Sequence, residues 1–202
     1  MQPVIHVIDD DEALRESVAF LLRAADFEVK GFASAQAFLA TLPDASLNCV
    51  ITDVRMPDMS GLDLVKRLKE LKVEVPVIVI TGHGDVALAV EAMKLGAADF
   101  FEKPFNDNLL LASVRAALQQ QAHQTKRHAE RADIEQRIAK LSAREKDVLT
   151  GLIEGNANKQ IAFDLGISPR TVEIYRANLM TKMHADSLSD LVRMALIAEM
   201  LG

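Results

Sequence analysis

The sequence is poor in aromatic residues and nearly free of cysteine, and each shortage excludes a class of protein. Tryptophan is absent, aromatic residues make up 4% of the 202 residues, and Cys49 is the one cysteine. A single cysteine excludes an internal disulfide framework. Because Cys49 lies in an apolar run, we expect a small buried core residue rather than a reactive thiol. The core must be built mainly from aliphatic side chains.

Long uncharged apolar stretches are also missing. No uncharged run approaches the length that crosses a membrane, and the start MQPVIHVIDDDE has no basic segment followed by an apolar one. Hydrophobic residues make up 50% of the chain and charged residues 26%, which is an ordinary globular composition. We expect a cytoplasmic protein that does not enter a membrane.

The charge is unevenly distributed along the chain. The net charge is −6, but residues 1–120 hold 11 Lys and Arg against 18 Asp and Glu, whereas residues 121–202 hold 12 against 11. An acidic first half and a slightly basic second half indicate two domains with different tasks.

Short apolar segments alternate with helical patterns through the first half. We predict buried strands at residues 4–8, 28–32, 49–52, 76–81 and 98–101. Apolar stripes at helical spacing run over residues 14–25 and 62–71, and a third comprises Val86, Ala89, Val90 and Met93. Strands that alternate with helices predict an α/β domain with a doubly wound, five-stranded parallel sheet and helices on both faces.

The second half has no strand signal. Residues 106–140 contain neither Pro nor Gly, and their apolar face thins into a polar, Ala-containing sequence, which favours a helix over a flexible tether. Four helical segments follow, at residues 142–155, 158–166, 167–183 and 187–201. We therefore divide the chain into a first domain at 1–118, a helical linker at 119–140 and a small all-α domain at 141–202.

Polar side chains follow four of the predicted strands. Asp9 and Asp10 come after the first strand, Asp53 and Thr81 end the third and fourth, and Lys103 follows the fifth. In an open parallel sheet, ligands bind beyond the carboxyl ends of the strands. Carboxylates there suit Mg²⁺, a hydroxyl and an ammonium suit phosphate oxygens, and Asp53 is a candidate nucleophile toward a phosphoryl group. Each residue alone has an ordinary surface explanation, but four strand ends with matching chemistry are harder to explain in that way.

This combination resembles the receiver domain of two-component response regulators. The motifs are Asp9-Asp10, RMPDMSG after Asp53, ITGHGD around Thr81 and FEKPF around Lys103, and the resemblance runs from Val4 to about Leu118. It implies a flavodoxin-like fold in which Asp53 accepts a phosphoryl group from a sensor histidine kinase. An alternative from the residues alone is a Mg²⁺-dependent phosphohydrolase, but such enzymes typically carry a second acid where this chain has Arg55.

The resemblance also implies roles for the neighbours of Asp53. Mg²⁺ would be held by Asp10, Asp53 and the backbone carbonyl of Arg55, with Asp9 acting through water. Thr81 and Lys103 would contact the phosphoryl oxygens, and a cis peptide would precede Pro104.

The same resemblance implies a switch and a dimer. Phe100 falls at the switch-aromatic position of the family, and Val90 and Lys94 are our candidates for a homodimer interface that forms on phosphorylation. Arg55 and His83 flank the expected phosphoryl group. We expect Arg55 to shield it and prolong its lifetime, whereas His83 can equally be a plain exposed residue.

The stretch NKQIAFDLGISPRTVEIYRANLMTKM has the layout of a helix-turn-helix: a short helix, a Gly-containing turn and a longer helix that starts at Ser-Pro. Val172, Leu179 and Met183 are expected to pack inward with Ile161 and Leu165. The outward and basic residues form the predicted DNA surface, with cations on phosphates, Glu173 on cytosine and Asn178 on adenine. That surface comprises Lys159, Ser168, Arg170, Thr171, Glu173, Ile174, Arg176, Ala177, Asn178 and Lys182.

Together with LSAREKDVL, this stretch resembles the LuxR-type DNA-binding domain, although the typical His of its recognition helix is Tyr175 here. A receiver followed by a LuxR-type domain is the arrangement of the NarL/FixJ class. It implies a transcription activator, not an enzyme, that binds promoter DNA and RNA polymerase and acts on nitrogen-fixation or microaerobic-respiration genes. A receiver with a protein-binding output is the alternative from the residues alone.

Overall fold

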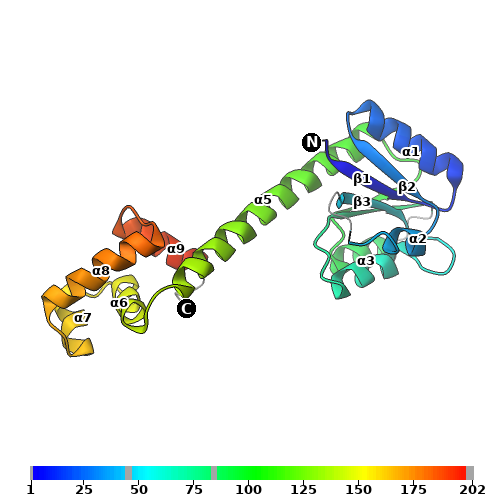
Figure 1. The fold of residues 1–202 in the computed structure, drawn as a ribbon. Helices are drawn as coiled ribbons and strands as arrows, with labels where there is room; N and C mark the ends of the chain where they lie inside the picture. The colour runs from blue at the N-terminus through cyan, green and yellow to red at the C-terminus, as the bar shows by residue number, and fades with distance from the viewer. Residues whose placement is uncertain (1, 44–46, 83–85, 199–202) are drawn as a thin grey trace. The chain divides into compact units, whose positions relative to one another are not determined.

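Figure 1 shows the computed structural model of the protein, which describes residues 2–43, 47–82 and 86–198. The chain divides into two compact units, Met1–His123 and Gln124–Gly202. In the described ranges, no helix combines the length and the apolar character needed to cross a membrane.

The first unit is built on a parallel sheet. Its strands are β1 (Val4–Ile8), β2 (Glu28–Phe32), β3 (Leu47–Asp53), β4 (Val77–Thr81) and β5 (Asp99–Glu102). The order is β2-β1-β3-β4-β5, and every neighbouring pair is parallel. The predicted doubly wound sheet is confirmed, with each strand end within two residues of its predicted position.

Helices cover both faces of this sheet. They are α1 (Glu12–Ala24), α2 (Ala35–Leu39), α3 (Gly61–Glu70), α4 (Val86–Leu95) and the first part of α5 (Asp107–Ala139). Successive residues of β3 alternate between two apolar clusters: Cys49 and Ile51 join the cluster of α1 and α5, and Val50 joins the cluster of α2, α3 and α4. Strands buried on both faces explain why their sequences are apolar at consecutive positions. The prediction that Cys49 is a core residue is confirmed. It is fully buried, and burial raises the pKa of its thiol to about 12.

Two features of the helices differ from the sequence analysis. The five-residue helix α2 was not predicted, because it is too short to show an apolar stripe; the side chain of Ser34 caps it by accepting from the Ala37 N–H. The α4 stripe is the outer face of that helix, since Val86, Val90 and Met93 are 80%, 46% and 50% exposed. The helix packs on the core through Leu88, Ala92 and Leu95 instead, which belong to the cluster of α2, α3 and α4.

The second unit is all-α. It contains α6 (Ala143–Ile153), α7 (Asn158–Leu165), α8 (Pro169–Met183) and α9 (Leu188–Ile197). The predicted Ser-Pro start of α8 is confirmed, since Ser168 caps the helix and Pro169 is its first residue. Ser142 and Glu145 form a capping box at the start of α6. Gly166 ends α7 at a φ of +64°, which glycine adopts without strain.

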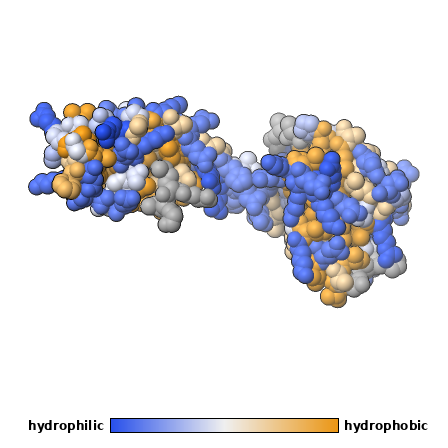
Figure 2. Space-filling view, turned by 90° about the horizontal axis from the view of Figure 1, so that it is seen from below, coloured by the Kyte–Doolittle hydropathy of each residue, from blue (hydrophilic) through white to orange (hydrophobic). Residues whose placement is uncertain are grey.

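The end of α5 belongs to the core of this second unit. Ile134 is 3% exposed and packs, with the partly buried Ile138, in one cluster with Val172, Leu179 and Leu191. The predicted helix-turn-helix packing is confirmed, since Val172, Leu179, Met183 and Ile161 are all buried in that cluster. Between the two cores, residues 122–129 of α5 are exposed and polar or alanine, and Figure 2 shows a hydrophilic surface along the middle of this helix.

Candidate functional site

The strand ends of the first unit bring the predicted acidic and basic residues together. Lys103 Nζ lies 2.5 Å from Asp53 Oδ1 and 3.0 Å from Asp9 Oδ2. Asp9 and Asp53 are 5% and 6% exposed, and Thr81 is fully buried. One ammonium therefore bridges two nearly buried carboxylates at the carboxyl edge of the sheet.

The turn after β3 fixes the Asp53 side chain. The Arg55 backbone N–H donates to Asp53 Oδ2 at 2.5 Å, so both carboxylate oxygens of Asp53 have partners. The chain then returns close to the strand end, where the Gly61 N–H donates to the Val54 carbonyl at 3.0 Å. A Cβ on Gly61 would lie 2.2 Å from the Asp53 carbonyl oxygen, so only glycine fits there. The turn PDMSG holds the carboxylate still while leaving Arg55 exposed.

The Asp9 side chain is held from the opposite direction. Its Oδ1 accepts from the Asp11 N–H at 2.9 Å, and its carbonyl oxygen accepts from Arg15 Nη1 at 2.6 Å. Asp11 in turn caps α1 by accepting from the Ala13 and Leu14 N–H groups. The sequence analysis did not identify Arg15, because a basic residue one turn into a helix gives no signal of a contact with the preceding loop.

Burial and pairing shift the pKa values of this site. Burial raises the pKa of Asp9, against the opposing hydrogen bonds from Lys103 and from the Asp11 N–H. Burial alone would lower the pKa of Lys103, but its hydrogen bonds to Asp53 and Asp9 outweigh burial and raise it. The ammonium thus stays protonated at neutral pH and compensates part of the carboxylate charge.

The predicted Mg²⁺ ligands have the right chemistry but are not gathered. Asp9 and Asp53 offer hard oxygen ligands at the strand ends, as Mg²⁺ prefers, whereas Asp10 is exposed. Within the described residues, no three His, Cys, Asp or Glu side chains are grouped so that they could hold a metal ion. Lys103 is the positive partner of both carboxylates here, so a cation at this edge would share or replace its role.

The predicted switch and dimer residues lie on β5 and α4. Phe100 is half-buried and packs on the cluster of α2, α3 and α4. Val90 and Lys94 are exposed on α4, together with Val86 and Met93. His83 lies outside the described residues. The Lys103–Pro104 peptide is cis, as predicted.

Most predicted DNA-contacting residues are exposed on α7 and α8. Ile174 is 56% exposed, although it is a large apolar residue on a helix that packs into a core. Ser168 and Thr171 form the start of α8, where the Ser168 hydroxyl accepts from the Thr171 N–H. The exposed members of the predicted set are Lys159, Ser168, Arg170, Glu173, Ile174, Ala177, Asn178 and Lys182.

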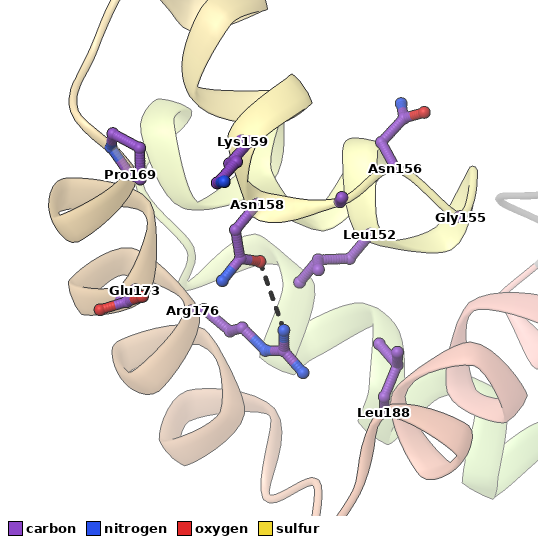
Figure 3. Close-up of a pocket in the computed structure, with 10 residues that line it drawn as sticks. Leu152, Gly155, Asn156, Asn158, Lys159, Pro169, Glu173, Arg176 and Leu188 are labelled. Atoms are coloured by element: carbon purple, nitrogen blue, oxygen red, sulfur yellow. Dashed lines mark hydrogen bonds between the residues drawn. The ribbon is translucent and has the colours of Figure 1, made fainter.

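Two of the predicted cations make contacts that the sequence did not indicate. Lys182 Nζ lies 2.7 Å from Glu145 Oε2, and this hydrogen bond lowers the pKa of the Glu145 carboxyl. Arg176 was expected to point outward; it is half-buried instead, and its Nη1 donates to Asn158 Oδ1 at 3.3 Å (Figure 3). That expectation was wrong because helical spacing alone does not show that Asn158 at the start of α7 lies within reach of Arg176.

Family models match both units. The model described as response regulator receiver domain matches residues 5–115, and the model described as bacterial regulatory proteins, luxR family, matches residues 139–195. The chain is 58% identical over 194 residues to the transcriptional regulatory protein FixJ of Azorhizobium caulinodans, which covers 96% of this chain and 92% of that protein. It is 50% identical over 192 residues to FixJ of Rhizobium meliloti, covering 95% of this chain and 94% of that protein.

Solved structures agree with these relatives. The chain is 53% identical to full-length FixJ from B. japonicum and superposes on it with a TM-score of 0.62. The match covers 100% of both chains. The response regulator StyR is 39% identical and superposes with a TM-score of 0.85, covering 97% of this chain and 99% of that chain. A receiver domain followed by a LuxR-family domain over nearly the full length of these relatives places the chain among the FixJ-like two-component response regulators, which regulate transcription.

Proposed function

We propose that Asp53 is the phosphoacceptor of this response regulator, that the protein works in the cytoplasm, and that a sensor histidine kinase is its donor. The observation that carries the proposal is the position of Lys103, within hydrogen-bond distance of both Asp53 and Asp9 at the sheet edge. Phosphoryl transfer to a carboxylate needs a rigid nucleophile and a positioned cation that stabilises the charge of the phosphoryl group. Asp53 and Lys103 have this arrangement.

The transfer is an in-line displacement. A carboxylate oxygen of Asp53 attacks the phosphorus of the kinase phosphohistidine, the new O–P bond forms, and the P–N bond breaks. The imidazole nitrogen leaves with the bonding electron pair. Lys103 exchanges its hydrogen bond with Asp53 for one with a phosphoryl oxygen, and the Thr81 hydroxyl donates to another.

The oxygen groups beside Asp53 have the chemistry that a magnesium ion needs. Asp10, Asp53 and the Arg55 carbonyl would hold it and Asp9 would act through water, because all four groups offer oxygen atoms. Bound there, Mg²⁺ would offset the repulsion between the attacking carboxylate and the incoming phosphoryl group. The residue two positions after Asp53 is Arg55, and its exposed guanidinium offers no general acid. This supports a signalling protein over a phosphohydrolase.

Phosphorylation shifts a pre-existing equilibrium toward an active receiver. In the active state Thr81 contacts the phosphoryl group, Phe100 turns inward, and α4 with β5 becomes a homodimer interface that includes Val90 and Lys94. The exposed apolar side chains of α4 support this surface. A charge-reversed Lys94→Glu variant should fail to dimerise on phosphorylation; normal dimerisation would exclude Lys94 from the interface.

The second unit delivers the output by binding promoter DNA. Helix α8 would lie in the major groove, where Glu173, Ile174, Ala177 and Asn178 reach base edges. Phosphate contacts would come from Lys159, Arg170 and the helix start at Ser168 and Thr171. A symmetric dimer predicts a palindromic operator, and the bound dimer would recruit RNA polymerase to nitrogen-fixation or microaerobic-respiration genes.

The test of the acceptor is intact mass after incubation with Mg²⁺ and a small acyl phosphate. Wild type should gain one phosphoryl group and Asp53→Asn none, while the matched control Asp58→Asn, an exposed carboxylate in the same turn, should label like wild type. An adduct that persists in Asp53→Asn would move the acceptor elsewhere. Folded wild type that stays unlabelled with both the acyl phosphate and candidate kinases would contradict the proposal.

A further inference from the structure

A cleft in the second unit lies between the loop that precedes α7 and the first turns of α8. It has a volume of about 570 Å³ and is lined on one side by Leu152 and Leu188. Lys159, Arg176 and Asn158 contribute its polar lining. Figure 3 shows the Arg176 side chain reaching across from α8 toward Asn158, with Leu188 beside its guanidinium.

The charge of Arg176 is not compensated in this cleft. Among the described residues, the Arg176 guanidinium makes one hydrogen bond, at 3.3 Å to a neutral amide, and pairs with no carboxylate. Glu173 lies one turn before it and also lines the cleft, but in Figure 3 its carboxylate points away from the guanidinium. Half-burial removes part of the hydration of a guanidinium, and an anion bound beside it would offset that cost.

Two other half-buried cations of the chain, Lys103 and Arg137, are compensated by carboxylates. Lys103 pairs with two carboxylates, and Arg137 pairs with Asp133 at 2.5 Å while also donating to the Met183 carbonyl. The exposed Lys182, near the end of α8, also pairs with a carboxylate, that of Glu145. Arg176 differs from these three cations because no carboxylate among the described residues pairs with it. A second cation, the exposed Lys159, lines the same cleft.

We propose that the cleft binds a backbone phosphate of the DNA duplex, held by Arg176 and Lys159, and that Arg176 does not read bases. This rests on the proposed DNA-binding function and assigns a role within it. In a helix-turn-helix the first helix crosses the sugar-phosphate backbone while the second enters the groove. A side chain that turns from α8 back toward the start of α7 is thus directed to the backbone side. Asn158 is the positioning residue that orients the guanidinium.

The two roles have different signatures. A phosphate contact adds to affinity on every sequence and to the salt dependence, whereas a base contact changes sequence preference. Losing one phosphate contact reduces the slope of log K against log salt by about 0.9 per bound chain. Between 50 and 200 mM salt, this makes the affinity of the variant fall about 3.5-fold less per bound chain than that of wild type.

The experiment measures duplex binding by the phosphorylated full chain across this salt range. Two probes are used: a duplex selected by the wild-type protein from a random pool, and an unrelated duplex of the same length. The variants are Arg176→Gln, Arg176→Lys, Asn158→Ala and the control Arg144→Gln. The control removes one positive charge from an exposed position on α6 that does not line the cleft. Thermal unfolding of each variant verifies that the second unit is folded.

Arg176→Gln should lower the slope on both probes equally, by about 0.9 per bound chain, while Arg176→Lys and Asn158→Ala keep the wild-type slope because the charge remains. Arg144→Gln should leave the slope nearly unchanged. An unchanged slope in Arg176→Gln, or a loss confined to the selected duplex with altered base preference, would overturn the proposal. Absence of salt-dependent binding in wild type would instead overturn DNA binding itself.

A free anion is the remaining source of the same chemistry. Inorganic phosphate at 10 mM, compared with chloride at matched ionic strength, should not raise the unfolding temperature of the second unit. Stabilisation of wild type that is lost in Arg176→Gln, together with an unaltered slope on DNA, would assign the cleft to a small phosphate ligand and refute the backbone contact.

Discussion

Removing the Lys103 ammonium should leave two nearly buried carboxylates facing each other without a counter-ion. The Asp9 and Asp53 side chains are each 7% exposed, the Lys103 side chain is 21% exposed, and the two pairs span 3.0 and 2.5 Å. Breaking a buried pair by deleting one partner costs roughly 3–5 kcal/mol. Because Lys103 retains some access to water, we expect Lys103→Met to lower the free energy of unfolding of the first unit by about 3 kcal/mol at pH 7.

The loss should depend on pH in a defined direction. Burial already raises the pKa of Asp9 above its ordinary value of 3.8, so the folded first unit takes up this proton more readily than the unfolded chain does. Without Lys103 that pKa rises further, and Lys103→Met recovers stability as the pH falls through it toward 3.8. The raised pKa of Lys103 in wild type acts in the alkaline range instead: its contribution is complete below 10.5 and is lost as the pH rises through the raised value.

The assay is hydrogen exchange of peptides from β1, β3 and β5 as a function of urea, without Mg²⁺, because it reports the first unit separately. Lys66→Met is the matched control: Lys66 pairs with Asp63 and Glu91 at 3.6 Å on the surface, so its loss should cost under about 0.5 kcal/mol. Adding Asp53→Asn to Lys103→Met should restore most of the lost stability. A variant as stable as wild type, or a deficit that does not shrink on acidification, would refute the buried-pair reasoning.

Three further predictions concern single residues. Arg55→Asn should shorten the lifetime of phosphorylated Asp53, because an amide can orient water where the guanidinium shields the phosphoryl group; dephosphorylation followed by intact mass measures it, and an unchanged decay rate would contradict the idea. Ile134→Ala should cost the second unit about 2–4 kcal/mol, because the side chain is 3% exposed in that core; urea unfolding measures it, and a loss below about 0.5 kcal/mol would exclude the end of α5 from the core. Ala157→Ser should stabilise the second unit by about 1 kcal/mol, because Ala157 is the N-cap of α7 and has no side-chain cap hydrogen bond; thermal unfolding measures it, with no rise in unfolding temperature arguing against the cap.

The sheet and its site were predictable because both depend on local patterns. Consecutive apolar residues mark strands buried on both faces, and the polar residue after each strand must lie at the shared edge of a parallel sheet. Asp9, Asp53 and Lys103 therefore converge although they are far apart in sequence. The same reasoning did not assemble Asp10 with them, because neighbouring residues in a loop can face different directions.

The errors arise where packing decides between equally good local patterns. The apolar stripe of α4 correctly indicated a helix but not its buried face, because the small Ala92 packs against the sheet while the larger Val86 and Met93 remain outside. Helix α2 is shorter than two turns and has no periodicity to detect. The sequence also does not show which residues of α5 belong to each core, because an uninterrupted helix gives no boundary signal.

Charge balance connects the two sites at the level of physical chemistry. Lys103 is shared by two carboxylates, so the dianionic phosphoryl group that Asp53 would gain meets a cation already positioned for it. Arg176 is held by an amide that orients but does not neutralise it, which keeps its attraction for an incoming anion. A carboxylate in place of Asn158 would satisfy Arg176 internally. We therefore expect Asn158→Asp to stabilise the second unit at neutral pH while weakening duplex binding, as measured by urea unfolding and by binding at 100 mM salt; stronger binding in this variant would show that the uncompensated guanidinium does not serve the DNA.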